Sequence, residues 1–493
     1  MFNKLKSHLY ALQILEYDAD KFLDWVLKNP GFYPQPQKGK LGLSAKTKFL
    51  YITSVLLLFI IPVSLGAIIL NKQRSLPLYG LSFTVFLVSF IVVAMIPFIP
   101  LTLSLFLLKP VEQVLRFYLL RKTESKIKSL NNLKVVGITG SYGKTSVKHL
   151  LAQILAVKYD VVATPESHNK LVSVARTVLS KVSPKTEVLI VEMGAYKTGE
   201  IKQICKMVKP QIGIITGITT QHLERFKNLE NIKRAKFELI ESLPSDGYAV
   251  FNLDNPDTRE LYEKCQIKKD GYSVSKTVVQ AGNRETSFEL FGNRITTPLL
   301  GHHNVLNIMA AVVVAKHLGL SDQEILTALK SIKPIPHRLE IVSDPSDSNS
   351  LIIDDAYSSN VEGYKAAFEL IRNLKYYPKI LVTPGLVELG EDQHRENFQM
   401  AKVASEIFDF AVVTNAENSE ALVSGFVDRG WTKSNAHAYE EKEMWIRRHE
   451  GLEKDKVVFP VKSLKQATDE VIPIVAQRSF LILFENDLPD IYR

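Results

Sequence analysis

The sequence predicts an α/β protein in which a two-span membrane hairpin precedes two soluble domains. The chain has 493 residues, which is about three times the length of an ordinary domain. Two long uncharged stretches lie between residues 49 and 108. From residue 133 onward, short apolar runs alternate with segments of helical periodicity, as in a mostly parallel sheet covered by helices.

Composition and charge exclude several classes of protein. Charged residues make up 23% and hydrophobic residues 46%, which is typical of globular chains and excludes a disordered or fibrous one. Cys205 and Cys265 are too few for a disulfide framework or a Cys-rich zinc site. Residues 1–134 hold 17 Lys and Arg against 6 Asp and Glu, whereas the rest of the chain has a balance of −2. This asymmetry favours membrane lipid over nucleic acid as a partner.

The two uncharged stretches predict a transmembrane hairpin. Phe49–Leu70 has 22 residues, which as a helix is ~33 Å long and enough to cross a bilayer core. Leu76–Leu108 has 33 residues, too long for one helix and too short for two helices with a loop. We therefore expect one span at about residues 78–97, followed by an interfacial stretch that returns along the membrane. Buried core helices of a soluble protein are the alternative.

Basic residues beside the spans predict that both ends of the hairpin face the cytoplasm. Four lysines precede the first span and four basic residues follow the second, whereas the connecting loop has only Lys72 and Arg74. The expected location is the cell membrane, with two spans and cytoplasmic catalytic domains. Residues 5–28 also show helical apolar periodicity, which suits either a helix on the inner membrane surface or packing against the soluble domains.

A phosphate-binding loop is predicted after residue 139. Leu133–Thr139 has the character of a short buried strand, Gly140–Gly143 is a glycine-rich turn, and apolar residues recur at helical spacing over 147–155. Glycines let backbone N–H groups approach phosphate oxygens at the helix N-terminus, and Lys144 would reach the β- and γ-phosphates. Ile138 stands where a strict Gly-x4-Gly-Lys motif has its first glycine, so a purely structural turn is the alternative.

Oxygen ligands for a magnesium ion are predicted beside this loop. Thr145 or Ser146 would hold the ion through a hydroxyl group. A second buried strand, Val188–Val191, is followed by Glu192. A carboxylate at the carboxyl end of a buried strand is a common place for the metal of a nucleotide.

Seven blocks of residues, in a fixed order, carry a family resemblance. They are Gly137–Ser146 with its glycines at 137, 140 and 143, Thr164–Asn169, His222–Phe226 with Ala235–Glu238, Asn252–Asp254, Gly301–Ala311, Asp354–Asn360 and Glu388–Glu391. This series resembles the Mur ligases, ATP-dependent enzymes that extend the peptidoglycan stem peptide, over about residues 133–400. The last two blocks resemble the branch that adds D-alanyl-D-alanine.

The resemblance implies a division of the chain and a fold for each domain. It implies a central P-loop ATPase domain with a parallel sheet, followed by a C-terminal ligase domain. In that C-terminal domain the sequence itself alternates strands at 351–353, 379–382, 410–413 and 480–483 with helices, which is a Rossmann-like pattern. The expected segments are an amphipathic juxtamembrane segment at 1–48, the transmembrane hairpin at 49–108, a basic linker helix at 109–132, the central domain at 133–335 and the C-terminal domain at 336–493.

The resemblance also implies roles for individual residues. The catalytic set would be Lys144, Glu192, His222 and Lys236, and the ligands of two Mg²⁺ ions in relatives correspond to Thr145, Glu192 and His222. ATP would contact Gly140, Gly143, Lys144, Thr145, Ser146, Asn304, Asn307, Arg338 and Asp355. The other substrates would contact Thr164, Asn169, Tyr357 and Asn360.

Two of these implied roles have structural alternatives. Lys236 matches a lysine that is carbamylated in relatives, but it could also be an ordinary surface lysine on a helix. His302–Asn304 could be a polar helix cap before the apolar run that follows. Zinc is a poor fit to His302 and His303, because they are adjacent in sequence and no His-x3-His or Cys pair supports them.

Four departures from the family pattern concern the substrates. No counterpart of the N-terminal domain that binds a UDP-sugar is visible. Glu166 and Lys170 replace a glycine and an asparagine, Ser358 replaces an asparagine, and Phe484–Asp490 replaces a basic C-terminal ending.

The expected function is that of a membrane-anchored amide ligase that works through an acyl phosphate. Its partners would be a cell-wall precursor and an amino acid or dipeptide. Two rivals stay open: a ligase for another acidic polymer such as poly-glutamate, and a non-catalytic nucleotide-dependent scaffold that binds wall-synthesis enzymes.

Overall fold

The protein divides into two compact units. A computed structural model describes residues 2–15, 17–28, 44–70, 76–96, 98–166, 168–219, 226–275, 277–343, 349–357, 360–387, 389–440, 456–476 and 479–485. One unit reaches from the N-terminus to Tyr118, and the second extends from Leu119 to Asp487. The boundary lies inside helix α5, which continues through most of the predicted linker at 109–132.

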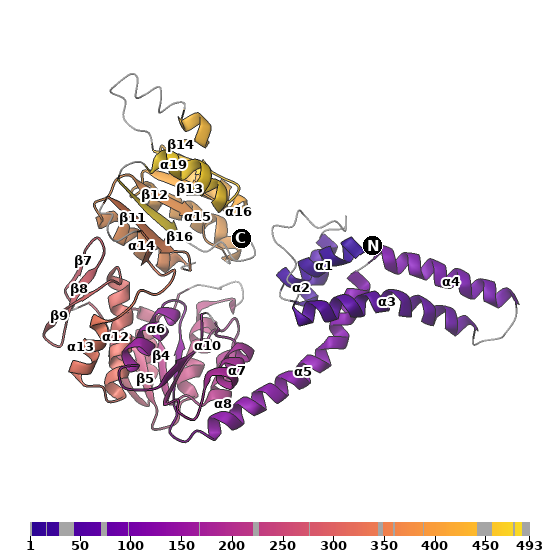
Figure 1. The fold of residues 1–493 in the computed structure, drawn as a ribbon, viewed down its shortest axis with the longest axis horizontal. Helices are drawn as coiled ribbons and strands as arrows, with labels where there is room; N and C mark the ends of the chain where they lie inside the picture. Colours follow the sequence, from indigo (N-terminus) through magenta and orange to yellow (C-terminus); the bar gives the residue numbers. More distant parts are fainter. Residues whose placement is uncertain are drawn as a thin grey trace. The chain divides into compact units, whose positions relative to one another are not determined.

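The N-terminal unit is entirely helical in its described part. Its helices are α1 (Phe2–Ile14), α2 (Ala19–Lys28), α3 (Ala45–Leu70), α4 (Leu76–Met95) and the first part of α5 (Phe98–Lys128). Figure 1 shows α3 and α4 side by side as an antiparallel pair. The Ser82 hydroxyl donates a 2.7 Å hydrogen bond to the Gly66 carbonyl, and this close approach uses the missing side chain of Gly66.

The uncharged run from residue 76 to residue 108 has room for parts of two helices, and the expectation that it is too short for them was wrong. The run contains α4, which ends at Met95, and the beginning of α5, which starts at Phe98. Pro100 lies in the first turn of α5, where a backbone N–H has no helical partner to lose, so the helix can continue through it. The interfacial position expected for the stretch after the second span stays a prediction.

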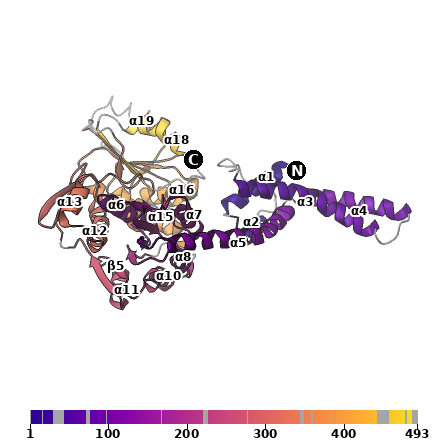
Figure 2. The same cartoon turned by 60° about the horizontal axis from the view of Figure 1, so that its bottom comes forward.

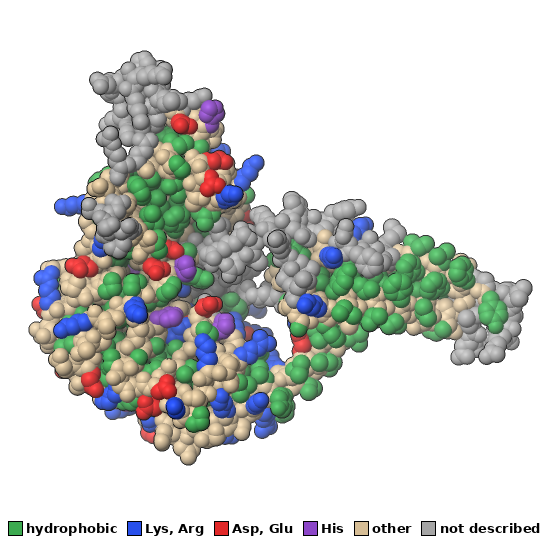
Figure 3. Space-filling model, viewed as in Figure 1, with side chains coloured by type: hydrophobic (Ala, Val, Ile, Leu, Met, Phe, Trp, Pro, Cys, Tyr) green, Lys and Arg blue, Asp and Glu red, His purple; other side chains and the backbone are tan. Residues whose placement is uncertain are grey.

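Two helices are long and apolar enough to cross a membrane, by length and composition alone. They are Ala45–Ile68 and Phe98–Lys128, whereas the apolar part of α4, Leu81–Val93, is shorter. The second of these helices is not the span predicted at 78–97. Large apolar side chains on all three helices are exposed, among them Ile52, Phe83 and Val114 at 57%, 65% and 68%. In Figure 3, apolar side chains (green) cover much of the face of these helices that is turned toward the viewer.

The apolar stripe of residues 5–28 packs inside the N-terminal unit. Leu5, Leu9 and Leu12 of α1, together with Phe22 and Val26 of α2, are buried against α3 and α5. The residues that cover them are Leu50, Leu101, Leu105 and Leu108. The stripe is thus covered by the hairpin helices themselves. The contacts predicted for it from the sequence were only the membrane surface and the soluble domains.

The central domain is built on a six-stranded sheet in which every pairing is parallel. Its strands lie in the order β2 (Val161–Ala163), β3 (Val188–Glu192), β1 (Lys134–Thr139), β4 (Ile212–Ile215), β5 (Tyr248–Asn252) and β6 (Lys268–Tyr272). Apolar residues on both faces of the inner strands β3, β1, β4 and β5 explain why helices cover both sides. A small antiparallel sheet follows, with strands β7 (Val279–Ala281), β8 (Thr286–Leu290) and β9 (Asn293–Thr297).

Two hydrophobic cores hold the helices onto the central sheet. One core contains α6 (Lys144–Leu155), α12 (His302–His317) and α13 (Asp322–Lys330), and Figure 2 shows these helices together. The other contains α7 (Leu171–Lys181), α8 (Glu200–Val208), α10 (Leu229–Glu241) and α11 (Pro256–Lys264). The carboxyl ends of β1 and β3, which are adjacent, consequently stand next to the N-terminus of α6.

The C-terminal domain has a seven-stranded sheet that is parallel except at one edge. Its strands lie in the order β10 (Glu340–Ile341), β11 (Ser350–Asp355), β16 (Phe480–Glu485), β12 (Lys379–Thr383), β13 (Phe410–Val413), β15 (Val457–Pro460) and β14 (Thr432–Lys433), and β10 is antiparallel. Its helices are α14 (Val361–Asn373), α15 (Gln393–Ser405), α16 (Ala416–Val427), α18 (Leu464–Gln466) and α19 (Ile472–Val475), with a 3₁₀ turn at Gly390–Asp392 and a π turn at Ala467–Val471. The four predicted strands are present, in a Rossmann-like alternation with helices.

Candidate active site

The loop between β1 and α6 has the geometry of a phosphate-binding loop. Gly143 precedes α6 in the left-handed conformation, with φ at 75°, and a Cβ atom there would lie 2.9 Å from the Asn307 side-chain oxygen. A Cβ atom at Gly140 would collide with the Thr216 hydroxyl. Only glycine fits both positions, so the backbone N–H groups at the start of α6 stay accessible.

Lys144 lies against this loop. Its ammonium donates hydrogen bonds to the carbonyl oxygens of Gly140, at 2.8 Å, and Ser141, at 3.3 Å. Burial lowers the pKa of Lys144, and the nearby carboxylate of Glu192 opposes that shift. The residue places a positive charge at the position where the loop would receive phosphate oxygens.

Glu192, at the end of β3, is the centre of a buried polar cluster. One carboxylate oxygen, Oε2, accepts hydrogen bonds from the Thr145 hydroxyl at 3.0 Å and from the Lys148 ammonium at 2.9 Å. The other, Oε1, accepts from the Asn169 amide at 3.0 Å. Burial raises the pKa of Glu192, but Lys148 and Lys144 lower it by more, so the net pKa lies below the ordinary value.

Lys148 was missed by the sequence analysis. Its side chain is fully buried in an ion pair with Glu192, which is itself 1% exposed. A signal was present, since Lys148 follows Lys144 by one helical turn and must share its face of α6. Thr164, which was predicted to contact substrate, is buried, and its hydroxyl accepts a hydrogen bond from the Glu192 backbone N–H.

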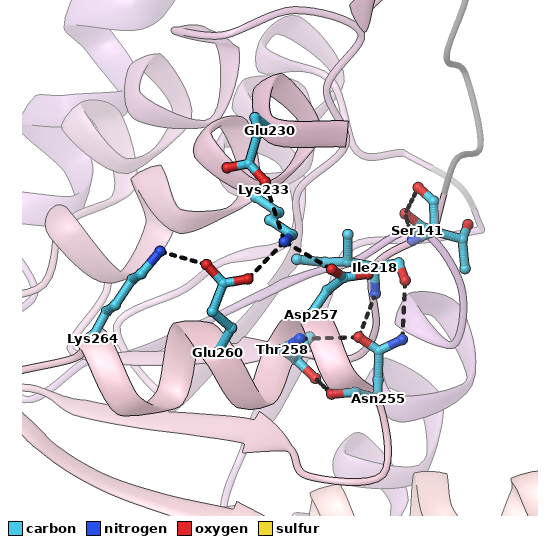
Figure 4. Close-up of polar contacts among 10 residues, drawn as sticks. Ser141, Ile218, Glu230, Lys233, Asn255, Asp257, Thr258, Glu260 and Lys264 are labelled. Carbon is cyan, nitrogen blue, oxygen red and sulfur yellow. Dashed lines mark hydrogen bonds and ion pairs between the residues drawn. The ribbon is translucent and has the colours of Figure 1, made fainter. Parts of the chain in front are cut away.

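Helix α10 carries two lysines with contrasting surroundings. Lys233 forms ion pairs with Asp257 at 2.8 Å, Glu260 at 2.7 Å and Glu230 at 3.2 Å, as Figure 4 shows, and these bonds raise its pKa. Lys236 is 5% exposed, and burial lowers its pKa well below the ordinary value, with Lys144 and Lys170 adding to the shift. The interpretation of Lys236 as a surface lysine is therefore wrong.

Glu238 fixes the position of α10. Its carboxylate accepts hydrogen bonds from the backbone N–H groups of Gly199 and of Lys202, the latter at 3.0 Å, at the N-terminus of α8. An acidic side chain is favourable at that end of a helix. The Ala-Lys-x-Glu block thus uses its glutamate for helix docking, which holds Lys236 in the interior.

The start of α12 contributes three polar side chains. Asn304 is buried and its amide donates a 2.8 Å hydrogen bond to the Leu300 carbonyl, so it is not a side-chain cap for the helix N–H groups. Asn307 reaches the phosphate loop at Gly143. Burial lowers the pKa of His303 to about 4, which makes the imidazole neutral at physiological pH.

The C-terminal domain contributes side chains to the same cleft as the phosphate-binding loop. Asp355 accepts a 3.0 Å hydrogen bond from the Leu339 backbone N–H, and the Arg338 guanidinium lies 6.0 Å from the centre of the Tyr357 ring. Asn360 caps α14 by accepting a 2.8 Å hydrogen bond from Gly363.

Glu485 is a second buried carboxylate that the sequence analysis did not single out. It pairs in register with Asp355 across β16 and β11, and its side chain is fully buried. Among the described residues, neither of its carboxylate oxygens has a hydrogen-bond partner. Burial, and then the charge of Asp355, raise the pKa of Glu485 well above the ordinary value, and Arg338 offsets this only in part. The sequence did contain a signal, because Glu485 ends a predicted buried strand.

A cleft of about 1380 Å³ brings most of the predicted residues together. Those that line it are Gly143, Lys144, Thr145, Ser146, Asn169, Glu192, Asn304, Asn307, Arg338, Asp355, Tyr357 and Asn360. Gly140, Thr164 and Lys236 do not line it, and His222 lies outside the described residues. The roles assigned to these residues stay predictions.

The donor atoms in the cleft fit magnesium better than a transition metal. Within the described ranges, no group of three or more His, Cys, Asp or Glu could hold a metal ion. Magnesium is commonly bound by one or two protein oxygen ligands, with phosphates and waters supplying the rest. Thr145 and Glu192 offer such oxygens beside the phosphate loop.

Comparisons with known proteins agree with this geometry. The Mur ligase middle domain matches residues 138–315, and the glutamate ligase domain of Mur ligases matches residues 337–461, so that together they cover more than half of the chain. The chain is 28% identical to the UDP-N-acetylmuramoyl-tripeptide–D-alanyl-D-alanine ligase of Bacillus subtilis, over 69% of its own length and 75% of the relative. It is 28% identical to the Escherichia coli protein of the same name, over 59% of its own length and 66% of the relative.

Solved structures show the same fold. MurF from Acinetobacter baumannii matches 76% of this chain and 77% of its own, with a TM-score of 0.63 and 22% identity. MurF from Thermotoga maritima in complex with ADP matches 76% of this chain and 80% of its own, with a TM-score of 0.61 and 22% identity. The matched domains, the order of the motifs and the shared fold lead to one conclusion: the chain belongs to the Mur ligase family.

Proposed function

We propose that this protein is a membrane-anchored, Mg-ATP-dependent ligase of the D-alanyl-D-alanine-adding type. It would join the carboxylate of a cell-wall peptide precursor to the amine of an amino acid or dipeptide. The observation that carries the proposal is the single cleft in which the phosphate loop and Glu192 of the central domain face Arg338 and Asp355 of the C-terminal domain. Family membership and the names of the relatives support the same reaction.

The reaction needs two displacements. In the first, the donor carboxylate attacks the γ-phosphorus of ATP, the bond to ADP breaks, and an acyl phosphate forms. In the second, the acceptor amine attacks the acyl carbon, phosphate leaves, and the amine nitrogen loses a proton. Both steps depend on aligned reactants and on cations that stabilise phosphate charge, and neither requires a covalent enzyme intermediate.

The residues of the cleft can supply these requirements. The N–H groups at the start of α6 and the Lys144 ammonium would bind phosphate oxygens. Thr145 and Glu192 would hold magnesium, which when bound supplies positive charge next to the phosphates. Arg338 and Asp355 come from the C-terminal domain, so correct placement of that domain would complete the site around the nucleotide and the amine.

Lys236 fits the proposed carbamate. A lowered pKa increases the fraction of Lys236 that is the neutral amine, which is the form that reacts with carbon dioxide. The product is an anion, and the cations that disfavour a protonated Lys236, Lys144 and Lys170, would stabilise it. A carbamate at this position would therefore relieve the repulsion that the protonated lysine experiences.

The exposed apolar surface of α3, α4 and α5 supports membrane anchoring. Soluble monomers rarely expose continuous apolar patches of more than a few hundred Å². Exposure of side chains such as Ile52, Phe83 and Val114 to water is unfavourable, and this unfavourable free energy would be removed in the apolar interior of a bilayer. We propose that these helices anchor the protein in the cell membrane with the ligase domains in the cytoplasm. Recovery of the full-length protein in the soluble fraction, without detergent, would contradict this.

Phosphate release from ATP tests the ligase proposal. The assay combines the purified protein with UDP-N-acetylmuramoyl-tripeptide and D-alanyl-D-alanine, and then replaces each of them with other wall precursors, single amino acids or poly-glutamate. We expect release that requires both a muramoyl peptide and an amine. Release that requires poly-glutamate would establish the alternative polymer ligase, and nucleotide binding without turnover on any pair would favour the scaffold.

A further inference from the structure

The pair formed by Lys148 and Glu192 points to a function that the ligase reaction does not itself require. The Lys148 side chain is fully buried, and its ammonium lies 2.9 Å from Oε2 of Glu192. The same ammonium also donates a hydrogen bond to the backbone carbonyl of Glu166. Lys148 therefore bridges the end of β3 and the segment that follows β2.

The carboxylate has little capacity left for another cation. Oε2 accepts from both Thr145 and Lys148, and Oε1 accepts from Asn169. A carboxylate oxygen has two lone-pair positions, and on Oε2 both are used. A metal ion that binds Oε2 next to the Thr145 hydroxyl must take the place of the Lys148 ammonium.

We propose that Lys148 is a positioning residue that acts as an internal counter-ion and prevents metal from binding before the nucleotide. Without nucleotide, a divalent ion would gain two protein oxygens but would have to break a buried ion pair, which is costly because the ammonium loses its partner. With nucleotide, phosphate oxygens add ligands for the ion and a negative field for the displaced ammonium. Metal and nucleotide consequently bind with positive coupling, and this coupling is reciprocal.

This inference rests on the nucleotide site of the proposed function but not on the substrates of ligation. The test is the binding of Mn²⁺, an oxygen-preferring stand-in for Mg²⁺, to the full-length protein without nucleotide and with a non-hydrolysable ATP analogue. Electron paramagnetic resonance of free Mn²⁺ measures the affinity directly. The readout does not depend on whether the enzyme adds D-alanyl-D-alanine, so a wrong assignment of the substrates leaves it intact.

Lys148→Gln is the informative variant, because glutamine keeps a hydrogen-bond donor and removes the charge. We expect Mn²⁺ to bind nucleotide-free Lys148→Gln at least about tenfold more tightly than the wild type, and the coupling to the analogue to fall by a similar factor. Lys148→Arg retains the cation and should stay within about threefold of the wild type. If Lys148→Gln does not fold, Lys148→Met is measured in its place.

Lys170→Gln is the matched control for the general electric field. Its ammonium lies over the Tyr196 ring, 3.3 Å from the ring centre, and adds positive charge near Lys144 without the ion pair to Glu192. We expect this variant to stay within about threefold of the wild type in nucleotide-free Mn²⁺ affinity. Unchanged affinity in Lys148→Gln, or an equal increase in Lys148→Gln and Lys170→Gln, would overturn the proposal.

Discussion

Glu192 and Glu485 occupy the same position in two different sheets, yet their surroundings differ in kind. Each ends a buried parallel strand, β3 in the central domain and β16 in the C-terminal domain, and each side chain is nearly or fully buried. Glu192 has three side-chain donors, whereas no donor within the described residues reaches the Glu485 carboxylate. The pKa of Glu192 is lowered and that of Glu485 is raised.

The comparison shows that the position at the end of a strand does not by itself determine the charge of a carboxylate. Burial disfavours the ionised form at both positions, and only the donors around Glu192 reverse that effect. Glu192 is therefore an anion that can exchange an ammonium for a metal ion. Burial instead favours the protonated form of Glu485, which lies next to Asp355, a residue that accepts a backbone hydrogen bond as a carboxylate would.

The largest effect is expected for Glu192→Gln. The amide keeps the size of the side chain but removes the charge that would hold magnesium and that pairs with Lys148. We expect ATP turnover to fall by about 10²–10³-fold, as it does when one electrostatic contact to a transition state is removed. Steady-state phosphate release at saturating ATP and magnesium measures the loss.

Glu485→Gln is the matched control for that substitution. It is isosteric in the same way and lies at the equivalent strand end, but it replaces an acid whose pKa is raised by burial, so the substitution removes less negative charge. Its turnover should stay within about threefold of the wild type. Equal losses in the two variants would mean that the contrast in charge between the two positions is wrong.

The next effect concerns Lys236 and uses Lys233, one helical turn earlier, as its control. Arginine cannot form a carbamate and would keep a fixed charge near Lys144, so Lys236→Arg should lose activity by about 10–100-fold. Lys233→Arg preserves a cation for Asp257 and Glu260, so its activity should be nearly unchanged. Added bicarbonate should raise the activity of the wild type in buffer depleted of carbon dioxide, and should not affect Lys236→Arg. Full activity in Lys236→Arg would refute the carbamate.

Local features of the site could be predicted from the sequence, and features set by distant partners could not. The loop from Gly140 to Lys144 and the position of Glu192 follow from glycine conformation and from strand ends, which are local properties. The place of β16 between β11 and β12 depends on pairing across more than a hundred residues, and it is this pairing that puts Glu485 beside Asp355. Lys148 lay between these cases, since its helix face was predictable but its partner on β3 was not.

The same distinction applies to the N-terminal unit. Uncharged runs predicted apolar helices correctly, because length and composition decide that property. The beginning of α5 soon after α4 depends on the fit of Pro100 into the first turn of the helix, and the burial of α1 and α2 depends on contacts with Leu50 and Leu105. Neither could be obtained from the periodicity of one segment alone.

The smallest effect is a change in how stability depends on pH, and it concerns Glu485. A carboxyl whose pKa is raised in the folded state binds a proton more tightly there than in the unfolded chain. Its favourable contribution is therefore complete below the unfolded pKa of about 4.3 and is lost as the pH rises through the higher folded value. Glutamine in place of Glu485 does not titrate, so this loss should disappear in the variant.

Thermal unfolding at a series of pH values from 5 to 8 measures this difference. We expect the melting temperature of Glu485→Gln to rise relative to that of the wild type as the pH increases, because only the wild type must either keep its proton or bury a charge. Glu406→Gln is the control, since Glu406 is an exposed residue that pairs with Arg372 at 3.3 Å and should show no such trend. If the two melting temperatures keep a constant separation across the pH range, Glu485 is already ionised in the folded protein. A donor must then reach it, and the contrast with Glu192 would be one of degree only.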